Sequence, residues 1–160
     1  MNRFMILIFL SSLVIANEVP NFDQFRVYKN KPYKYFFFKI YDLKILTKNS
    51  QKVDYKQDHI FQYTYNRNVD NDDLIKTTMQ EWERLQLCKE EHAIKWAEQL
   101  KKIWPNIKKD DELMAFFSKD STHFFHNKKF IGEIKGRIFA RTFFQIWLDP
   151  NSRMTELHED

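Results

Sequence analysis

The stretch Tyr33-Lys34-Tyr35-Phe36-Phe37-Phe38-Lys39-Ile40-Tyr41-Asp42-Leu43-Lys44-Ile45-Leu46 decides the fold of this chain. Aromatic and β-branched residues dominate it, and its apolar and polar positions partly alternate, which is typical of β-structure. The length of the run indicates either one long bent strand or two strands in succession. A sheet with so many large apolar side chains needs another layer packed against it.

Further strands flank this run. Residues 22–28 have the pattern of a first strand that ends in a turn at Asn30-Lys31-Pro32, and residues 59–66 form the strand after the long run. Later strands are expected at 113–117, 122–125 and 130–134, with Asn127-Lys128-Lys129 as the last hairpin turn. The chain has 2 Gly, which disfavours a many-stranded sandwich with tight hairpin turns of the primed types.

Three amphipathic helices are predicted between and after the strands. Asp70-Asn71-Asp72-Asp73 supplies an N-cap and first-turn acids to a helix over residues 71–87. A second helix starts near Lys89 and ends at Pro105, and a third begins at Gly136 and stops at 149–151. Four rings lie on the apolar helix faces and are expected to be buried against the sheet: Trp82, Trp96, Phe143 and Trp147. Segregated strands and helices predict an α+β domain with helices on one face of an antiparallel sheet.

The N-terminus has the features of a secretory signal peptide. Arg3 precedes a short apolar run, and Val14 and Ala16 stand three and one before the expected cleavage site. We predict a signal peptide over residues 1–16 and a single exported domain over residues 17–160, in a bacterial periplasm or another extracellular space. A membrane anchor is the alternative, but a spanning helix needs roughly 20 apolar residues. We expect a monomer with no membrane span after cleavage.

Composition excludes several classes of function. The 26 Lys and Arg interleave with 22 Asp and Glu, so no basic stripe indicates nucleic-acid binding. The scarcity of glycine excludes a glycine-rich phosphate loop, and we expect no cofactor. Cys88 is the only cysteine, so no intrachain disulfide can form. It is either a small buried apolar residue or a free thiol able to pair between chains.

No catalytic set is evident from the residues. His123 and His126 are three apart on a predicted strand and point to opposite faces, and no further ligand lies near them, so we predict no metal site. The carboxylate pairs Asp72-Asp73 and Asp110-Asp111 fit a helix cap and a turn. The run Phe36-Phe37-Phe38 and the helix aromatics either line a ligand cleft or form plain core.

Five segments match, in order, the pattern of one protein family. They are Phe37–Tyr41, Gln62–Leu74, Ile103–Asp111, Phe124–Gly132 and Phe143–Leu148. On these residues the chain resembles the chalcone isomerase-like proteins of bacteria, although Asp110 replaces a glycine of the pattern. The resemblance implies an open-faced β-sandwich, in which a helical layer covers a large antiparallel sheet and a ligand cleft lies between them.

The catalytic pattern of the plant members is not matched. The resemblance implies an arginine and a threonine on the long strand, where this chain has Tyr33 and, approximately, Phe36. Of the family's helix motif Tyr-x-x-Lys-x-x-x-Asn, only Lys76 remains, and Gln80 replaces the asparagine. Without a guanidinium to stabilise developing enolate charge, we expect no chalcone cyclisation.

The resemblance therefore implies a non-catalytic protein that binds a small apolar or acidic ligand such as a fatty acid. The expected ligand site comprises Tyr33, Phe36, Phe38, Lys76 and Gln80, with Lys76 near the acidic end of the ligand. The alternatives are an intramolecular lyase or isomerase of the chalcone isomerase type with a rearranged site, and a structural envelope protein.

Overall fold

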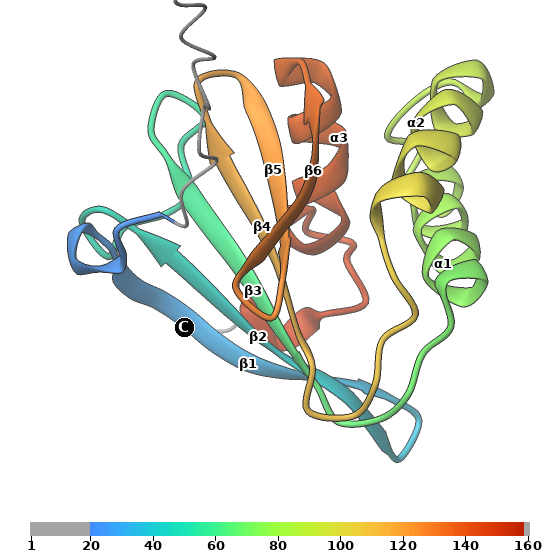
Figure 1. The fold of residues 1–160 in the computed structure, drawn as a ribbon, viewed down its shortest axis with the longest axis horizontal. Coiled ribbons are helices and arrows are strands. Elements are labelled where there is room, and N and C mark those ends of the chain that lie inside the picture. The colour runs from blue at the N-terminus through green and yellow to red at the C-terminus, as the bar shows by residue number, and fades with distance from the viewer. Residues whose placement is uncertain (1–19, 159–160) are drawn as a thin grey trace, which may run out of the picture.

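The computed structural model describes residues 20–158, so the predicted signal peptide and its cleavage site lie outside the described residues. One antiparallel sheet contains six strands, each paired with the next along the chain: β1 (Arg26–Tyr35), β2 (Phe38–Thr47), β3 (His59–Tyr65), β4 (Glu112–Ser118), β5 (Ser121–His126) and β6 (Lys129–Lys135). Helices α1 (Asn71–Arg84) and α2 (Glu90–Ile103) connect β3 to β4, and α3 (Arg137–Leu148) follows β6. All three helices lie on one face of the sheet (Figure 1). The predicted α+β open-faced β-sandwich is thus confirmed.

The aromatic run contains a turn. Tyr35 at the end of β1 pairs with Phe38 at the start of β2, so Phe36-Phe37 is a two-residue hairpin loop. Phe36 has a φ of 53°, a left-handed conformation that costs a residue with a side chain roughly 1–2 kcal/mol. The predicted strand over 22–28 with a turn at Asn30-Lys31-Pro32 is wrong. β1 runs straight through Pro32, which an edge strand tolerates because it needs no hydrogen bond from that nitrogen on its outer side.

Two other hairpins use turns that the scarcity of glycine seemed to disfavour. Lys119-Asp120 connects β4 to β5 and Asn127-Lys128 connects β5 to β6, and all four residues have positive φ. Positive φ at both central positions is the mark of the primed turn that matches strand twist. Asn and Asp tolerate this conformation, so in each loop only the lysine adopts a positive φ that its side chain disfavours. The glycine count was therefore a poor guide to the turns.

Aromatic side chains fill the layer between sheet and helices. Trp82, Trp96 and Phe143 are buried as predicted, and Phe143 stacks on Phe139 with ring centroids 5.7 Å apart. Trp147 is partly buried, and its indole Nε1 donates a hydrogen bond of 2.8 Å to the hydroxyl of Tyr41. The helical layer is therefore fixed to the sheet by both apolar packing and a directed polar contact.

The opposite face of the sheet carries a smaller apolar cluster. Its buried members are Phe25, Leu46, Ile60, Met114 and Phe125, and Phe22 of the 3₁₀ helix Phe22–Gln24 packs on them. The residues predicted to form a first strand thus begin with this helix. Both faces of the sheet bury apolar side chains, but within residues 20–158 only the helical face is covered by a complete layer.

Gly132 allows α2 to approach the sheet closely. A Cβ atom at this position would lie 2.8 Å from Cγ1 of Ile103 at the end of α2, and the φ of Gly132 is 152°.

Cys88 lies in the loop between α1 and α2 and is half-buried rather than fully buried. Burial raises the pKa of its thiol. Among residues 20–158, no helix is both long enough and apolar enough to cross a membrane.

Candidate functional site

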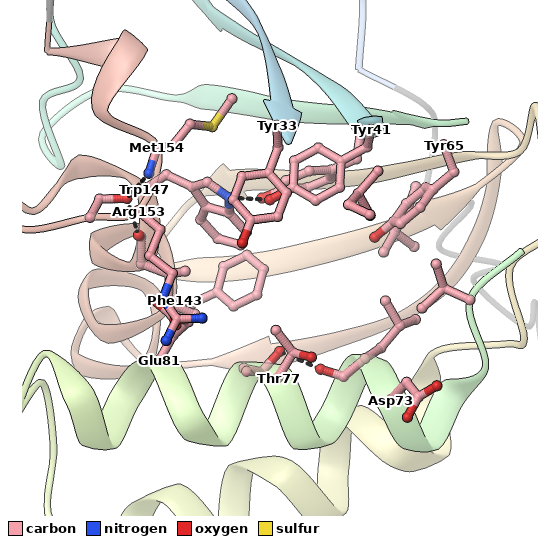
Figure 2. Close-up of a pocket in the computed structure, with 18 of the residues that line it drawn as sticks. Tyr33, Tyr41, Tyr65, Asp73, Thr77, Glu81, Phe143, Trp147, Arg153 and Met154 are labelled. Atoms are coloured by element: carbon pink, nitrogen blue, oxygen red, sulfur yellow. Dashed lines mark hydrogen bonds and ion pairs between the residues drawn. The ribbon is translucent and has the colours of Figure 1, made fainter. Parts of the chain in front are cut away.

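A cavity of about 130 Å³ lies between the sheet, α1, α3 and the segment that follows α3 (Figure 2). Most of its wall is apolar or aromatic. The contributing residues include Ile40, Val69, Leu74, Trp104, Leu113, Phe143, Ile146 and Trp147. A concave, mainly apolar space with a few polar groups is the usual form of a small-molecule site.

The sheet contributes a wall of tyrosines. Tyr33 and Tyr41 are paired across β1 and β2, and their rings stack with centroids 5.0 Å apart. Tyr41 also contacts Tyr63 and Tyr65, each with ring centroids 5.5 Å away. Because alternate residues of a strand share a face, all four rings project to the helical side. Burial raises the pKa values of Tyr41, Tyr63 and Tyr65, so these hydroxyls remain protonated at neutral pH.

Helix α1 contributes a polar stripe. Asp73, Thr77 and Glu81 line the cavity, and their spacing of four places them on one face of the helix. Asp73 and Glu81 stand at opposite ends of the stripe with Thr77 between them (Figure 2), which is about 12 Å along the helix axis. The cavity therefore has two distinct ends.

Two guanidinium groups lie at the Glu81 end. The Glu81 carboxylate is only 8% exposed; it accepts a hydrogen bond of 2.6 Å from Nη2 of Arg84 and forms an ion pair with Nε of Arg153 at 3.2 Å. Arg84 also interacts with the charge of Asp149 and does not line the cavity, so it is the guanidinium of Arg153 that reaches the cavity wall at this end. The pKa of the adjacent Tyr33 is raised, first by burial and then by Glu81, while Arg153 acts in the opposite direction. A protonated hydroxyl and a guanidinium thus lie together at this end.

The segment after α3 holds Arg153 in place through its backbone. Arg84 Nη1 donates to the carbonyl oxygen of Asn151 at 3.0 Å. Ser152 Oγ donates to the carbonyl oxygen of Ile146 at 2.7 Å and accepts from the backbone N–H of Met154 at 3.1 Å. These contacts flank Arg153 on both sides, so its guanidinium is presented to the cavity although 48% of the side chain is exposed.

Two further donors in the cavity wall lack partners. The hydroxyl of Tyr63 and the indole Nε1 of Trp104 are buried without a hydrogen-bond partner among residues 20–158, and both residues line the cavity. An unsatisfied buried polar group costs about 1–3 kcal/mol. Both atoms are closed off by the surrounding side chains, so the two residues contribute their rings to the cavity wall.

The structure separates the five residues expected at the ligand site. Tyr33 lines the cavity. Phe36 and Phe38 lie at the hairpin tip, 78% and 64% exposed, and are not part of its wall. Lys76 and Gln80 line a separate depression between α1 and α2. The cavity stripe of α1 runs through positions 73, 77 and 81, and each residue one place earlier is rotated by about 100° on the helix.

Sequence reasoning missed the charged end of the cavity. The signal for Glu81 was present in the four-residue spacing of Asp73, Thr77 and Glu81, which only an analysis of polar residues on the helix would detect. Arg153 had no such signal, because it lies in a segment with the composition of a polar tail. The sequence predicted that the cavity lacks a guanidinium, because Tyr33 stands where the family pattern has an arginine. In the structure, the guanidinium of Arg153 reaches the cavity from another element.

The two histidines singled out from the sequence have different partners. His123 Nδ1 lies 3.2 Å from Glu133 Oε2, whereas His126 Nε2 lies 2.9 Å from Asp111 Oδ2. The hydrogen bond from Asn127, with that from the backbone of Lys108, lowers the pKa of Asp111 to about 2. Within residues 20–158, no group of three His, Cys, Asp or Glu side chains could hold a metal ion.

Fold and cavity together define an open-faced β-sandwich with a small-molecule cavity between its layers. A family model described as chalcone isomerase-like matches residues 34–160, and the chain belongs to that family. Its fold is similar to the crystal structure of a fatty-acid binding protein from Arabidopsis thaliana, with a TM-score of 0.64 over 81% of this chain and 82% of that chain. The two sequences are 5% identical, so the likeness concerns the fold. A search of curated proteins finds no match.

Proposed function

We propose that this protein is a non-catalytic member of its family that binds a small apolar ligand with an acidic end, such as a fatty acid. The apolar part occupies the aromatic cavity, and the carboxylate lies beside Arg153 and Tyr33. The observation that carries the proposal is the guanidinium of Arg153 next to the Tyr33 hydroxyl at one end of a mainly apolar cavity. The fatty-acid binding protein with a similar fold supports this class of ligand.

The charges at the two ends orient the ligand. Arg153 supplies a planar guanidinium, which suits a carboxylate in two-point contact, and the protonated hydroxyl of Tyr33 adds a donor. Asp73 at the other end of the stripe repels a carboxylate and leaves that end to the hydrocarbon tail.

The volume limits the size of the ligand. A cavity of about 130 Å³ is comparable with the roughly 150 Å³ cavity that accepts benzene in another protein, and it is smaller than the roughly 300 Å³ at which drug-sized sites begin. The cavity therefore holds a single ring or a short acyl chain as it stands. A longer chain must extend through the open end or displace side chains, so we expect affinity to be highest for medium-length chains.

One observation favours a second function. Arg153 beside the Tyr33 hydroxyl is a pair able to stabilise an enolate or phenolate, which an intramolecular lyase with a rearranged site would need. Its guanidinium also contacts Glu81 at 3.2 Å, which reduces its charge for a bound carboxylate and for a developing anion alike, so the mainly apolar wall of the cavity decides between the two functions. Ligand binding remains the function that the geometry supports best.

A displacement titration tests the proposal. A fluorescent fatty acid is bound to the purified protein and displaced by decanoic acid, in the wild type and in Arg153→Gln. We expect binding by the wild type and a loss of about ten- to hundredfold in the variant, as for removal of a charged hydrogen bond. Arg141→Gln, which changes an exposed arginine on the outer side of α3 near Tyr55, is the matched control and should bind normally. Equal affinity in all three proteins would contradict the proposal, and enzyme-dependent loss of chalcone absorbance would favour the lyase.

We further propose that the protein is exported by a bacterium to its periplasm and acts there as a monomer. The basic start and short apolar run over residues 1–16 support export. N-terminal sequencing of the protein from its native cells tests this: a start at Asn17 is expected, and a retained Met1 would indicate an anchor instead. Native mass spectrometry of the same material would identify the bound ligand.

A further inference from the structure

The tip of the β1–β2 hairpin exposes four consecutive aromatic side chains. Tyr35, Phe36, Phe37 and Phe38 are 51%, 78%, 98% and 64% exposed. The hairpin projects past the loop that joins β3 to α1 (Figure 1), and none of these four rings contributes to the cavity wall. Large exposed apolar groups in one place usually mark an interaction site.

The backbone at the tip adds a second observation. Phe36 adopts a φ of 53°, which is a genuine outlier for a bulky residue. Glycine or asparagine would take this turn position without strain and would be more soluble. A solvent-exposed phenylalanine in a strained turn therefore serves something other than the stability of the fold.

Positive charge surrounds the aromatic tip. Lys34 and Lys39 are exposed and directly opposite each other on β1 and β2, an arrangement of like charges that is unfavourable without a counter-charge. Asp42 Oδ2 lies 2.8 Å from Nζ of Lys39, while Lys34 has no ion pair among residues 20–158. The guanidinium of Arg67 lies 6.0 Å from the centroid of the Phe38 ring. Three cations and one carboxylate thus ring the tip, which suits an anionic surface.

We propose that this tip inserts into the surface of an anionic lipid bilayer. Tyrosine is enriched at the membrane interface, phenylalanine is common on the apolar face of segments that lie in it, and adjacent lysines and arginines are attracted by anionic headgroups. The exposed parts of the four residues amount to about 600 Å², at the lower end of the roughly 600–1,000 Å² that each partner contributes to a stable protein interface. A narrow convex tip also offers little complementarity to another folded surface, whereas a fluid interface adapts to it.

A fluorophore at the tip tests the proposal on the full chain. In a Cys88→Ser background, an environment-sensitive dye is attached at Phe37→Cys or, as the matched control, at Ile138→Cys. Ile138 is 71% exposed and lies on α3, away from the hairpin. With vesicles of equal parts phosphatidylcholine and phosphatidylglycerol, the emission should shift to the blue at position 37 and stay unchanged at position 138. Because the dye reports locally, binding through the apolar residues near the N-terminus cannot imitate this result.

Unlabelled variants supply a second readout. Phe37→Ser should weaken partition onto the same vesicles about tenfold, the lower bound for removing a buried phenyl ring, while Ile138→Ser should not. Circular dichroism verifies that each variant is folded. An absent shift at position 37, or equal shifts at both positions, would overturn the proposal. A concentration-dependent dimer that Phe37→Ser abolishes, without any dye shift on vesicles, would assign the tip to a second copy of the chain instead.

Discussion

The β1–β2 hairpin places aromatic residues in two opposite environments. Tyr33 and Tyr41 stack in the cavity wall, while Phe36 and Phe37, only a few positions away, are 78% and 98% exposed at the tip. Both regions come from the same aromatic run, so composition does not distinguish them. The position of the turn does, because it decides which rings reach the helical layer and which extend beyond it. An aromatic run therefore indicates a ligand site only after its turn has been located.

The largest expected effect contrasts two phenylalanines. Phe143→Ala, which empties a position that is 1% exposed in the cavity wall, should lower the free energy of unfolding by about 3–5 kcal/mol. Phe37→Ala at the tip should change it by less than about 0.5 kcal/mol. Denaturant titrations measure both. A loss at Phe37 that equals the loss at Phe143 would show that the tip is part of the folded core.

Acid should act on the interior of the sheet rather than on its exposed tip. His59 is 1% exposed, and burial lowers its pKa to about 4. This pKa is below the ordinary histidine value of roughly 6.5. The contribution of neutral His59 to the free energy of unfolding is therefore fully present above about pH 6.5. It is lost as the pH falls from about 6.5 toward 4, because in that range the unfolded state binds a proton that the folded state does not. We expect a loss of about 2 kcal/mol between roughly pH 7 and pH 5.

Urea unfolding of His59→Phe at both pH values tests this expectation. The variant should lose most of the acid sensitivity, because phenylalanine retains the ring packing against Phe117 and Phe144 without a titrating nitrogen. His158→Gln, which replaces an exposed histidine near the C-terminus, should behave as the wild type. Unchanged acid sensitivity in His59→Phe would show that groups other than His59 cause the loss of stability at low pH.

A smaller effect is expected from two tyrosines on the same strand. Tyr33→Phe removes a hydroxyl beside Arg153 and should lower the affinity for decanoic acid by about two- to tenfold, the range of one hydrogen bond. Tyr35→Phe, two positions further toward the tip, should leave the affinity unchanged. The same displacement titration measures both variants. Equal losses of affinity in Tyr33→Phe and Tyr35→Phe would contradict the placement of the ligand in the cavity rather than at the tip.

The smallest effect is expected at Lys76. Its side chain lies in the depression between α1 and α2 and not in the cavity, so Lys76→Gln should leave the affinity for decanoic acid within about twofold, the lower end of the range for one hydrogen bond. Isothermal titration calorimetry is suited to this comparison. A tenfold loss would indicate that the family motif on the helix, and not Arg153, locates the acidic end of the ligand.

The fold was more accessible from the sequence than the site. Periodicity located the three helices and most strands, because burial on one face imposes a regular spacing. The turn at Phe36-Phe37 escaped prediction because neither residue is a turn former, and the strain it carries has no sequence signature. Of the residues that line the cavity, Tyr33 had been named from the sequence, whereas Arg153 depends on a loop held by backbone contacts at Asn151 and Ser152. Such contacts follow from tertiary packing and leave no periodic pattern.

The most direct test of ligand binding is a crystal structure of the protein with decanoic acid. We predict that the acyl chain of the ligand occupies the cavity between the tyrosine wall and α1, with the ligand's carboxylate within hydrogen-bonding distance of Arg153 and Tyr33. A ligand bound in the depression beside Lys76 and Gln80, or reversed so that its carboxylate lies at Asp73, would contradict it.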